Sequence, residues 1–186
     1  MTKKNTRVEI KVVKGPDEIS RTAAEMIVGQ AKVSELSTGP FTLALSGGAT
    51  PRLLHKRLSF EAAKMSRQAW HKFNFFWGDE RHVPPEHPQS NFRMARETLF
   101  ASAAVPAQNI HRVHAEETDA VIVAEKYERE LQSFFDLKDR QLPRLDCVLL
   151  GIGPDGHTAS LFPKTTALKE KKRLVVANWV DKFQSH

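Results

Sequence analysis

Phe41-Thr-Leu-Ala-Leu45 is an almost unbroken apolar run, and Ser46-Gly-Gly-Ala-Thr-Pro51 follows it directly. A short run of this composition is typical of a strand that is buried on both faces of a parallel sheet. The two glycines permit a sharp turn, Thr50 suits the N-cap of a helix, and Pro51 suits its first position. The sequence therefore predicts a strand, a tight turn and then a helix over Arg52–Ala63.

The same succession of strand, turn and helix occurs again along the chain. Phe73–Trp77 is a second apolar run, followed by a charged, proline-rich loop and a predicted helix from Ser90 to Ala103. Leu145–Leu150 is the clearest buried strand of the sequence, and a glycine-rich loop follows it. The remaining predicted elements are strands at Val8–Val12, Ile110–Val113 and Leu174–Val180 and helices at Pro16–Ala31 and Glu117–Phe135. Strands that alternate with helices predict an α/β fold with a mainly parallel sheet covered on both faces.

Length and composition fit one ordinary globular domain over residues 1–186, with 40% hydrophobic and 27% charged residues. No apolar run approaches the roughly 20 residues of a membrane span. The polar, basic start does not have the pattern of a signal peptide. The single cysteine, Cys147, cannot form an internal disulfide, which fits a reducing compartment. We therefore expect a cytoplasmic protein with no membrane partner.

The net charge of +6 indicates that the protein has an anionic partner. Its basic residues are spread along the chain and do not alternate with aromatic residues, as they do in many nucleic-acid-binding segments. A phosphorylated small molecule is therefore favoured over nucleic acid.

Ligands of open parallel sheets bind beyond the carboxyl ends of the strands, where three glycine-containing segments of this chain begin. In the first of them, Ser46, Gly47 and Gly48 can offer backbone N–H groups to an anion at the start of a helix. No Gly-Lys-Ser/Thr follows, so the segment is not a Walker A loop. A tight turn with nothing bound remains the alternative.

Asp79-Glu80-Arg81 follows the second strand as three consecutive charges. An arginine in this place can hold a phosphate through paired, charge-assisted hydrogen bonds. Asp79 can orient a water molecule or a histidine. The alternative is a solvated loop whose charges only end the strand.

The third segment, Gly151–His157, fits the G-x-G-x-x-G pattern of dinucleotide-binding proteins. Two features argue against a dinucleotide: Phe162-Pro163 would end the helix that must carry the pyrophosphate, and no acidic residue is well placed for the ribose. We expect no cofactor. Histidine is the side chain that most readily accepts a proton near neutral pH, so His157 is the candidate base.

Two other groups of histidines are candidate metal ligands. They are His82 and His87 with Glu80 and Glu86, and His111 and His114 with Glu116. Neither group has the spacing of an established metal site, and no metal is expected.

Taken together, three stretches closely resemble the 6-phosphogluconolactonase family, which shares a superfamily with glucosamine-6-phosphate deaminase. The stretches are Leu43–Pro51, Trp77–Arg81 with Ser90-Asn91, and Leu150–Pro163. The resemblance implies a three-layer, Rossmann-like α/β/α fold and hydrolysis of 6-phosphoglucono-1,5-lactone to 6-phosphogluconate in the pentose phosphate pathway. It also implies a functional link to glucose-6-phosphate dehydrogenase.

The resemblance implies a role for each candidate site residue. His157 would act as general base toward water, and Asp79 would orient the histidine or the water. The expected substrate-binding residues are Ser46, Gly47, Gly48 and Arg81 for the phosphate, Asn91 for a sugar hydroxyl, and Gly153, Asp155 and Gly156 from the loop of His157.

Two alternatives remain open on the sequence. Deaminases of the superfamily usually have a tyrosine in place of Arg81 and a glutamate in place of Phe162, so their pattern fits less well. Family members also continue beyond the equivalent of His186, through a further strand, a basic phosphate-binding residue and a final helix. The chain is therefore expected to be C-terminally truncated relative to the family, and it could bind a sugar phosphate without turning it over.

Overall fold

Three parallel strands form the central sheet of the computed structural model, which describes residues 8–34, 39–62, 70–103 and 105–186. The strands are β1 (Phe41–Leu45), β2 (Phe73–Trp77) and β3 (Cys147–Val148), in the order β2-β1-β3. β1 pairs with β2 along its whole length, and β3 pairs with the middle of β1. Since all three strands run in the same direction, the loops that follow them leave from one edge of the sheet.

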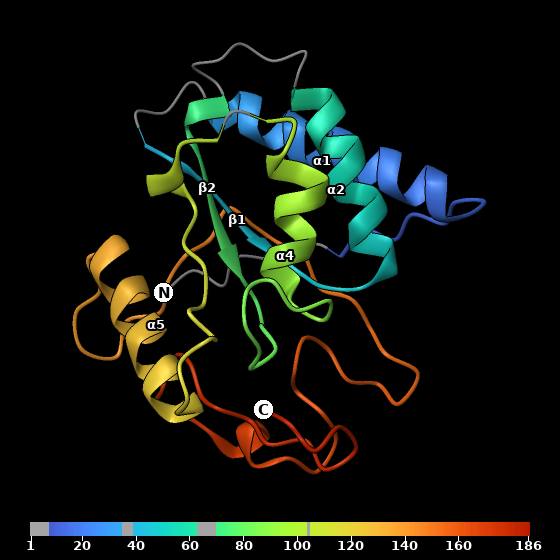
Figure 1. The fold of residues 1–186 in the computed structure, drawn as a ribbon. Helices are drawn as coiled ribbons and strands as arrows, with labels where there is room; N and C mark the ends of the chain where they lie inside the picture. The colour runs from blue at the N-terminus through green and yellow to red at the C-terminus, as the bar shows by residue number, and fades with distance from the viewer. Residues whose placement is uncertain (1–7, 35–38, 63–69, 104) are drawn as a thin grey trace.

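Helices cover both faces of this sheet (Figure 1). Leu43 and Phe75 belong to a core cluster with α1 (Pro16–Ser34), α2 (Ala49–Ala62) and α4 (Asn91–Ala95). Ala44 and Phe76, the next residues along the strands, pack instead with Tyr127 and Leu131 of α5 (Ala120–Phe134). Successive strand residues point to opposite faces, so each five-residue strand contributes to two cores. The predicted three-layer α/β/α fold is confirmed.

The third strand differs from its prediction. Leu145–Leu150 was expected to be fully buried, yet only Cys147 and Val148 form a strand, and Val148 and Leu150 are 45% and 64% exposed. The physical reason is position: β3 lies at an edge of the sheet formed by the described residues, with β1 on one side only. An apolar run predicts burial, but it does not predict how many neighbouring strands the chain supplies.

Two predicted strands do not form. Residues 8–12 have no regular structure, and Val8, Ile10 and Val12 are 80–92% exposed. The segment Leu174–Val180 forms only an isolated bridge between Val180 and Ser185. Alternation of apolar and polar residues is not enough for a strand when no neighbouring backbone completes the hydrogen bonds. The predicted strand Ile110–Val113 is reduced to a parallel bridge between Ile110 and Phe75.

The helices start or end close to their predicted bounds. α2 begins at Ala49, so Thr50 and Pro51 lie inside its first turn and not at its cap, and Ala63 lies outside the described residues. α4 begins after Ser90, whose hydroxyl accepts a hydrogen bond from the Arg93 N–H at 3.1 Å. The remaining turns are a π-helical turn, η1 (Arg96–Phe100), and the 3-10 turns η2 (Ala107–Asn109) and η3 (Thr166–Lys169). None of the described helices combines the length and apolarity that a membrane span requires.

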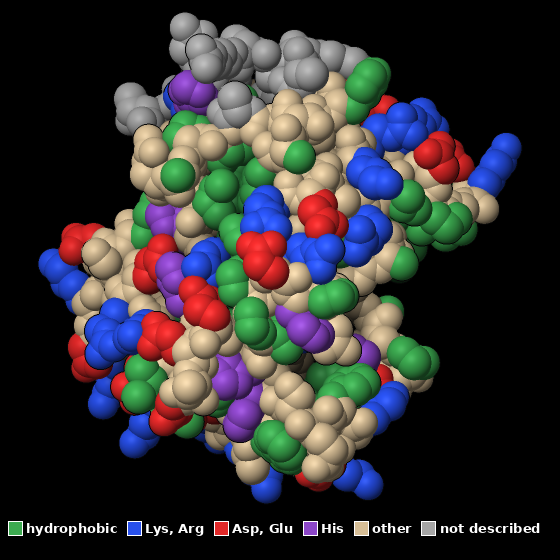
Figure 2. Space-filling view, in the orientation of Figure 1, with side chains coloured by type: hydrophobic (Ala, Val, Ile, Leu, Met, Phe, Trp, Pro, Cys, Tyr) green, Lys and Arg blue, Asp and Glu red, His purple; other side chains and the backbone are tan. Residues whose placement is uncertain are grey.

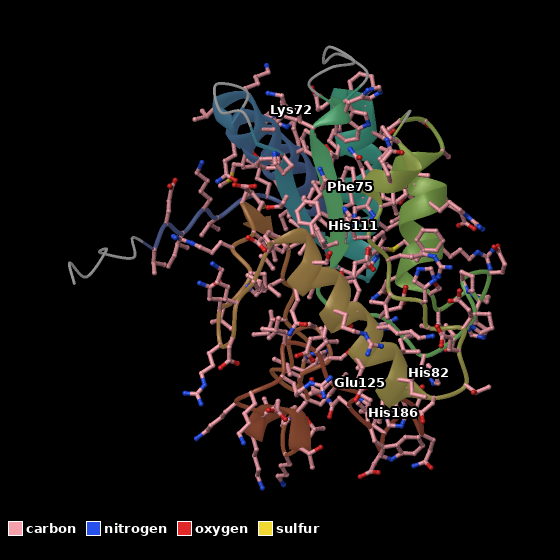
Figure 3. The ribbon with its side chains drawn as sticks, turned by 90° about the vertical axis from the view of Figure 1, so that its left-hand side faces the viewer. Lys72, Phe75, His82, His111, Glu125 and His186 are labelled. Atoms are coloured by element: carbon pink, nitrogen blue, oxygen red, sulfur yellow. The ribbon has the colours of Figure 1, made fainter. Side chains whose placement is uncertain are left out.

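The last residues of the chain lie near the carboxyl ends of the strands. Lys72 comes just before β2, and His82 follows that strand. Figure 3 shows these two residues far apart and His186 beside His82. The His82 N–H donates a hydrogen bond to the His186 carbonyl at 3.2 Å. The loops after the strands therefore share one side of the molecule with residues 178–186.

His55 of α2 is a buried histidine that should make the free energy of unfolding depend on pH. Its side chain is fully buried, and its Nδ1 lies 3.4 Å from the Thr98 hydroxyl. Burial, with a smaller contribution from the Arg52 charge, lowers the pKa of His55 to about 4. The folded state thus favours the neutral imidazole, whereas an unfolded histidine titrates near pH 6.5.

We expect the free energy of unfolding to be unaffected by His55 above pH 6.5 and to fall by about 3 kcal/mol as the pH drops toward 4. Urea unfolding between pH 4 and 7.5 measures this, and His55→Asn should remove most of the slope between pH 6.5 and 4. The exposed His87→Asn is the control, because its slope should match that of the unsubstituted protein. Equal slopes for His55→Asn and the unsubstituted protein would contradict the assignment.

Candidate active site

A groove of about 710 Å³ lies where the three glycine-containing loops leave the sheet. This volume is in the range of small-molecule binding sites. The groove brings together seven of the ten residues that the sequence nominated, namely Ser46, Gly47, Gly48, Asp79, Arg81, Gly153 and His157. The other three, Asn91, Asp155 and Gly156, do not line it, and each has another position in the site.

The turn after β1 brings the start of α2 to the groove. Gly48 has a φ of +106°, a conformation that residues with a side chain rarely adopt. α2 begins at Ala49, so its first N–H groups have no carbonyl partner inside the helix. These donors and the positive end of the helix dipole favour an anion in the groove.

Asn91 supports this turn from behind. Its side chain is buried, and its Nδ2 donates a hydrogen bond to the Asp79 carbonyl at 2.9 Å. A Cβ on Gly47 would lie 2.0 Å from the Asn91 Oδ1, so only glycine fits against it. The side chain thus joins the Ser46 turn to the loop after β2, and its expected contact with a sugar hydroxyl stays a prediction.

Glu80 anchors the loop after β2, and sequence reasoning missed this role. Its carboxylate accepts hydrogen bonds from the N–H groups of Asn91 at 2.7 Å, Phe92 at 2.8 Å and Arg81 at 2.8 Å. Burial raises the pKa of Glu80, and these hydrogen bonds oppose that rise. The carboxylate therefore satisfies the first N–H groups of α4 and is not available as a metal ligand.

Asp79 and Arg81 alternate with Glu80 and reach the groove. The Asp79 side chain is only 9% exposed, and its Oδ2 accepts a hydrogen bond from the Ser160 hydroxyl at 2.7 Å. The Arg81 side chain is 46% exposed, and its Nε lies 4.0 Å from the same Oδ2. One further contact, to the Gln89 carbonyl at 3.3 Å, leaves most of the guanidinium N–H groups available to an anion.

His157 is held by a carboxylate of its own loop. Its Nδ1 lies 2.5 Å from Oδ1 of Asp155, and this hydrogen bond is the main cause that lowers the pKa of the Asp155 carboxyl. An ionised carboxylate only accepts hydrogen bonds, so in the neutral ring Nδ1 carries the proton and Nε2 the lone pair. Asp79 was expected to orient the histidine or the water; in the structure Asp155 is the hydrogen-bond partner of the imidazole. The expected contact of Asp155 with substrate stays a prediction.

The ring of His157 is also fixed by the residues around it. Its centroid lies 4.1 Å from that of Phe162, with an angle of 25° between the two planes, and its side chain is 26% exposed. The Gly153 N–H donates to the His157 carbonyl at 2.8 Å, and the Gly156 N–H donates to the Gly153 carbonyl at 3.0 Å. Gly156, with a φ of +82°, thus forms the turn of this loop and does not line the groove.

We expect Gly153→Ala to displace the imidazole of His157. A Cβ at this position would lie 2.1 Å from Cε1 and 2.2 Å from Nδ1 of the ring, which must then rotate away from Asp155. Since the ring is 26% exposed and can rotate toward solvent, the fold should persist with a loss of only about 1 kcal/mol for the hydrogen bond. The NMR signals of the His157 ring and the thermal unfolding midpoint measure both effects.

Gly151→Ala is the matched control for this substitution, because no atom lies within 4 Å of the Cβ that it would add. It should leave the ring signals of His157 unchanged. Unchanged ring signals in Gly153→Ala as well would show that the ring does not occupy this position.

The other nominated histidines contact neighbouring side chains or backbone. Nε2 of His82 lies 2.6 Å from the Glu117 carbonyl, and Nδ1 of His111 lies 2.9 Å from Glu130. Over the described ranges, no three His, Cys, Asp or Glu side chains are grouped in a way that could hold a metal ion. On the face seen in Figure 2, acidic and basic side chains lie intermixed and histidines gather on the lower half. The described residues on this face therefore form no continuous basic surface of the kind that nucleic acid binds.

Comparison with known proteins gives a consistent set of relatives. Residues 14–184 match the family model described as glucosamine-6-phosphate isomerases/6-phosphogluconolactonase. The chain is 43% identical over 162 residues to a 6-phosphogluconolactonase of Nostoc sp., covering 86% of this chain and 65% of the relative. It is 44% identical over 137 residues to one of Synechocystis sp., covering 74% and 55%. The chain thus spans less than two thirds of the length of these curated relatives.

Solved structures agree with the sequence comparison. The 6-phosphogluconolactonase from Trypanosoma cruzi superposes with a TM-score of 0.80 at 34% identity, covering 90% of this chain and 67% of that one. The enzyme from Trypanosoma brucei gives a TM-score of 0.79 at 36% identity, covering 89% and 67%.

Proposed function

Because the chain belongs to the glucosamine-6-phosphate isomerase/6-phosphogluconolactonase family, we propose that it hydrolyses 6-phosphoglucono-1,5-lactone to 6-phosphogluconate. The observation that carries the proposal is the groove, in which an anion-binding turn, an arginine and a carboxylate-held histidine face one space. The reaction would take place in the cytoplasm as part of the pentose phosphate pathway. Glucose-6-phosphate dehydrogenase, which produces this lactone, would supply the substrate.

The 6-phosphate would bind between the start of α2 and Arg81. Residues 47–50 line this space at the helix N-terminus, where the dipole and direct hydrogen bonds from backbone N–H groups would stabilise a phosphate. The planar guanidinium of Arg81 can add two parallel hydrogen bonds to phosphate oxygens. This arrangement selects a phosphorylated ring over an unmodified one.

His157 would act as the general base. Asp155 binds Nδ1, so the lone pair of Nε2 can take a proton from a water molecule. The water oxygen then forms a bond to the lactone C1 and gives a tetrahedral oxyanion. When the intermediate collapses, the bond between C1 and the ring oxygen breaks, and the imidazolium returns its proton to that oxygen.

Backbone N–H groups of the glycine-containing turns would stabilise the oxyanion, a contribution of about 10²–10³-fold per donor in other enzymes. Asp79 borders the same groove but has its hydrogen bond with Ser160, so its role would be to orient the attacking water or Arg81. No step of this reaction needs a metal or an organic cofactor.

The environment of His157 favours a lactonase over the sister deaminase. Deaminases of the superfamily have a glutamate in place of Phe162, which assists ring opening. In this chain that position holds an aromatic ring stacked on the imidazole. A hydrophobic ring can orient the histidine but cannot exchange a proton, which suits a reaction that needs one base and no second acid.

A coupled assay with freshly generated lactone tests the proposal. Glucose-6-phosphate dehydrogenase forms the lactone, and its disappearance is followed against the spontaneous rate in the absence of the protein. We expect first-order loss of the lactone, with a rate constant that exceeds the spontaneous one and increases in proportion to protein concentration. Binding of 6-phosphogluconate without acceleration of lactone loss would instead support a sugar-phosphate-binding protein that has no turnover.

A further inference from the structure

Asp79 and His157 lie on different loops, and no hydrogen bond between them sets their separation. Across the described residues, the Asp79 carboxylate is bonded to Ser160 and lies 4.0 Å from Arg81, and the His157 ring is bonded to Asp155. A reaction that uses both side chains needs a fixed distance between them. Some other contact must therefore connect the two loops.

Ser160 makes this connection on the side of Asp79. Its hydroxyl donates to Oδ2 of Asp79 at 2.7 Å, and its carbonyl accepts a hydrogen bond from Nδ2 of the buried Asn178 at 2.6 Å. The same Nδ2 also lies 3.3 Å from the Thr165 hydroxyl. Asn178 thus fixes the backbone of Ser160, and the Ser160 hydroxyl in turn fixes the Asp79 carboxylate.

Phe162 makes the corresponding contact on the side of His157. Its ring stacks on the imidazole at 4.1 Å, and Phe183 packs edge-on against it at 5.5 Å. Its carbonyl accepts hydrogen bonds from the N–H of Thr165 at 3.2 Å and from the hydroxyl of Thr165 at 2.8 Å. The ring therefore has little freedom to move away from the histidine.

We infer that Ser160 and Phe162, here called the clamp pair, are positioning residues that set the geometry between Asp79 and His157. They are two positions apart on one segment, and each contacts a different member of the proposed catalytic pair. This inference rests on the proposed function, because it assigns the clamp pair a role in that reaction. Neither residue needs to touch the substrate.

The expected effect is on turnover more than on binding. A displacement of about 1 Å at a reacting group can cost about 100-fold in rate. The proposed phosphate contacts do not depend on the clamp pair alone: the α2 N-terminus lies on another loop, and Arg81 is held by the Gln89 carbonyl at 3.3 Å as well as by Asp79. Loss of either clamp residue should therefore lower kcat and leave KM almost unchanged.

Steady-state kinetics of the full chain with the lactone test this expectation. Ser160→Ala and Phe162→Leu should each lower kcat by about 10–100-fold with KM within about threefold. Ser160→Thr keeps the hydroxyl and Phe162→Tyr keeps the ring, so both should retain most of kcat. Leu161→Ala is the matched control, because this residue lies between the clamp pair and its side chain is 43% exposed.

NMR of the His157 ring supplies a readout that does not depend on turnover. In the unsubstituted protein the ring protons should show the upfield shift that a stacked aromatic ring causes, and the nitrogen signals should show a single tautomer with the proton on Nδ1. Phe162→Leu should remove the shift and mix the tautomers, whereas Leu161→Ala should change neither. If the unsubstituted protein has no lactonase activity, the proposed function fails, but the ring signals still decide the positioning role.

The inference is overturned if Phe162→Leu leaves the ring signals unchanged, or if both alanine and leucine variants keep kcat within twofold. It is also overturned if Ser160→Thr and Phe162→Tyr lose as much kcat as Ser160→Ala and Phe162→Leu. Equal losses would indicate that any substitution damages the segment. If Phe162→Leu does not fold, the split between kcat and KM in Ser160→Ala decides alone.

Discussion

Replacing His157 with glutamine is expected to lower kcat for the phosphorylated lactone by about 10²–10⁴-fold, the usual contribution of a general base. Glutamine approximates the size and polarity of histidine, but its amide cannot accept a proton from water. KM should change little, because the proposed phosphate contacts belong to the Ser46 turn and Arg81, which line the groove. Steady-state kinetics with freshly generated lactone, corrected for the spontaneous rate, measure both constants.

His114→Gln is the matched control for this substitution. The His114 side chain is 55% exposed, does not line the groove, and has its Nδ1 3.4 Å from Glu116. Its kcat should equal that of the unsubstituted protein. A His157→Gln variant that turns over the lactone at the same rate as His114→Gln would remove His157 from the reaction and leave the groove as a binding site.

The sequence predicted well those parts of the molecule that depend on local patterns. β1 and β2 are five-residue apolar strands with every residue buried, so their sequences alone predict their depth in the sheet. The loops after parallel strands must meet at the carboxyl end of the sheet, which is why the sequence alone predicts Ser46, Arg81 and His157 in one groove.

The sequence did not reveal features that depend on contacts between distant segments. Nothing near Glu80 in the sequence shows that its carboxylate will accept the first N–H groups of α4, because the acceptor and the donors are separated by a proline-rich loop. Asn91 was assigned to the substrate from its motif, yet its amide is buried between two loops. A motif shows which residues gather, but not which of them face the solvent.

The identity of the histidine's partner illustrates the same limit. Asp79 follows the end of β2 and Asp155 lies in the loop after β3, and the turn at Gly156 brings Asp155 back to Nδ1 of His157. A signal was present in the spacing, because a carboxylate two residues before a histidine can reach it across a tight turn. The same limit applies to the sheet. β3 is exposed and Leu174–Val180 forms no strand because pairing depends on which other segments lie beside them, and no single segment encodes this.

Arg81→Ala is expected to raise KM for the phosphorylated lactone by roughly 10–100-fold, because it removes charge-assisted hydrogen bonds that are each worth about 1.5–3 kcal/mol. The loss falls on binding, since the guanidinium would contact the phosphate in both the ground state and the transition state, so kcat should change far less. Arg81→Lys should recover only part of the affinity, because an ammonium group keeps the charge but not the planar pair of donors. The measurement is kcat and KM for the three proteins at constant ionic strength.

The unphosphorylated glucono-1,5-lactone makes this prediction specific to the phosphate. If Arg81 holds that group, Arg81→Ala should leave kcat/KM for the unphosphorylated lactone unchanged while it lowers kcat/KM for the phosphorylated one. Arg112→Ala is the matched control: Arg112 is paired with Glu116 at 2.7 Å outside the groove, so neither lactone should be affected. An equal loss with both lactones in Arg81→Ala would mean that the arginine shapes the loop around Asp79, and the phosphate would then have to be held by the α2 N-terminus alone.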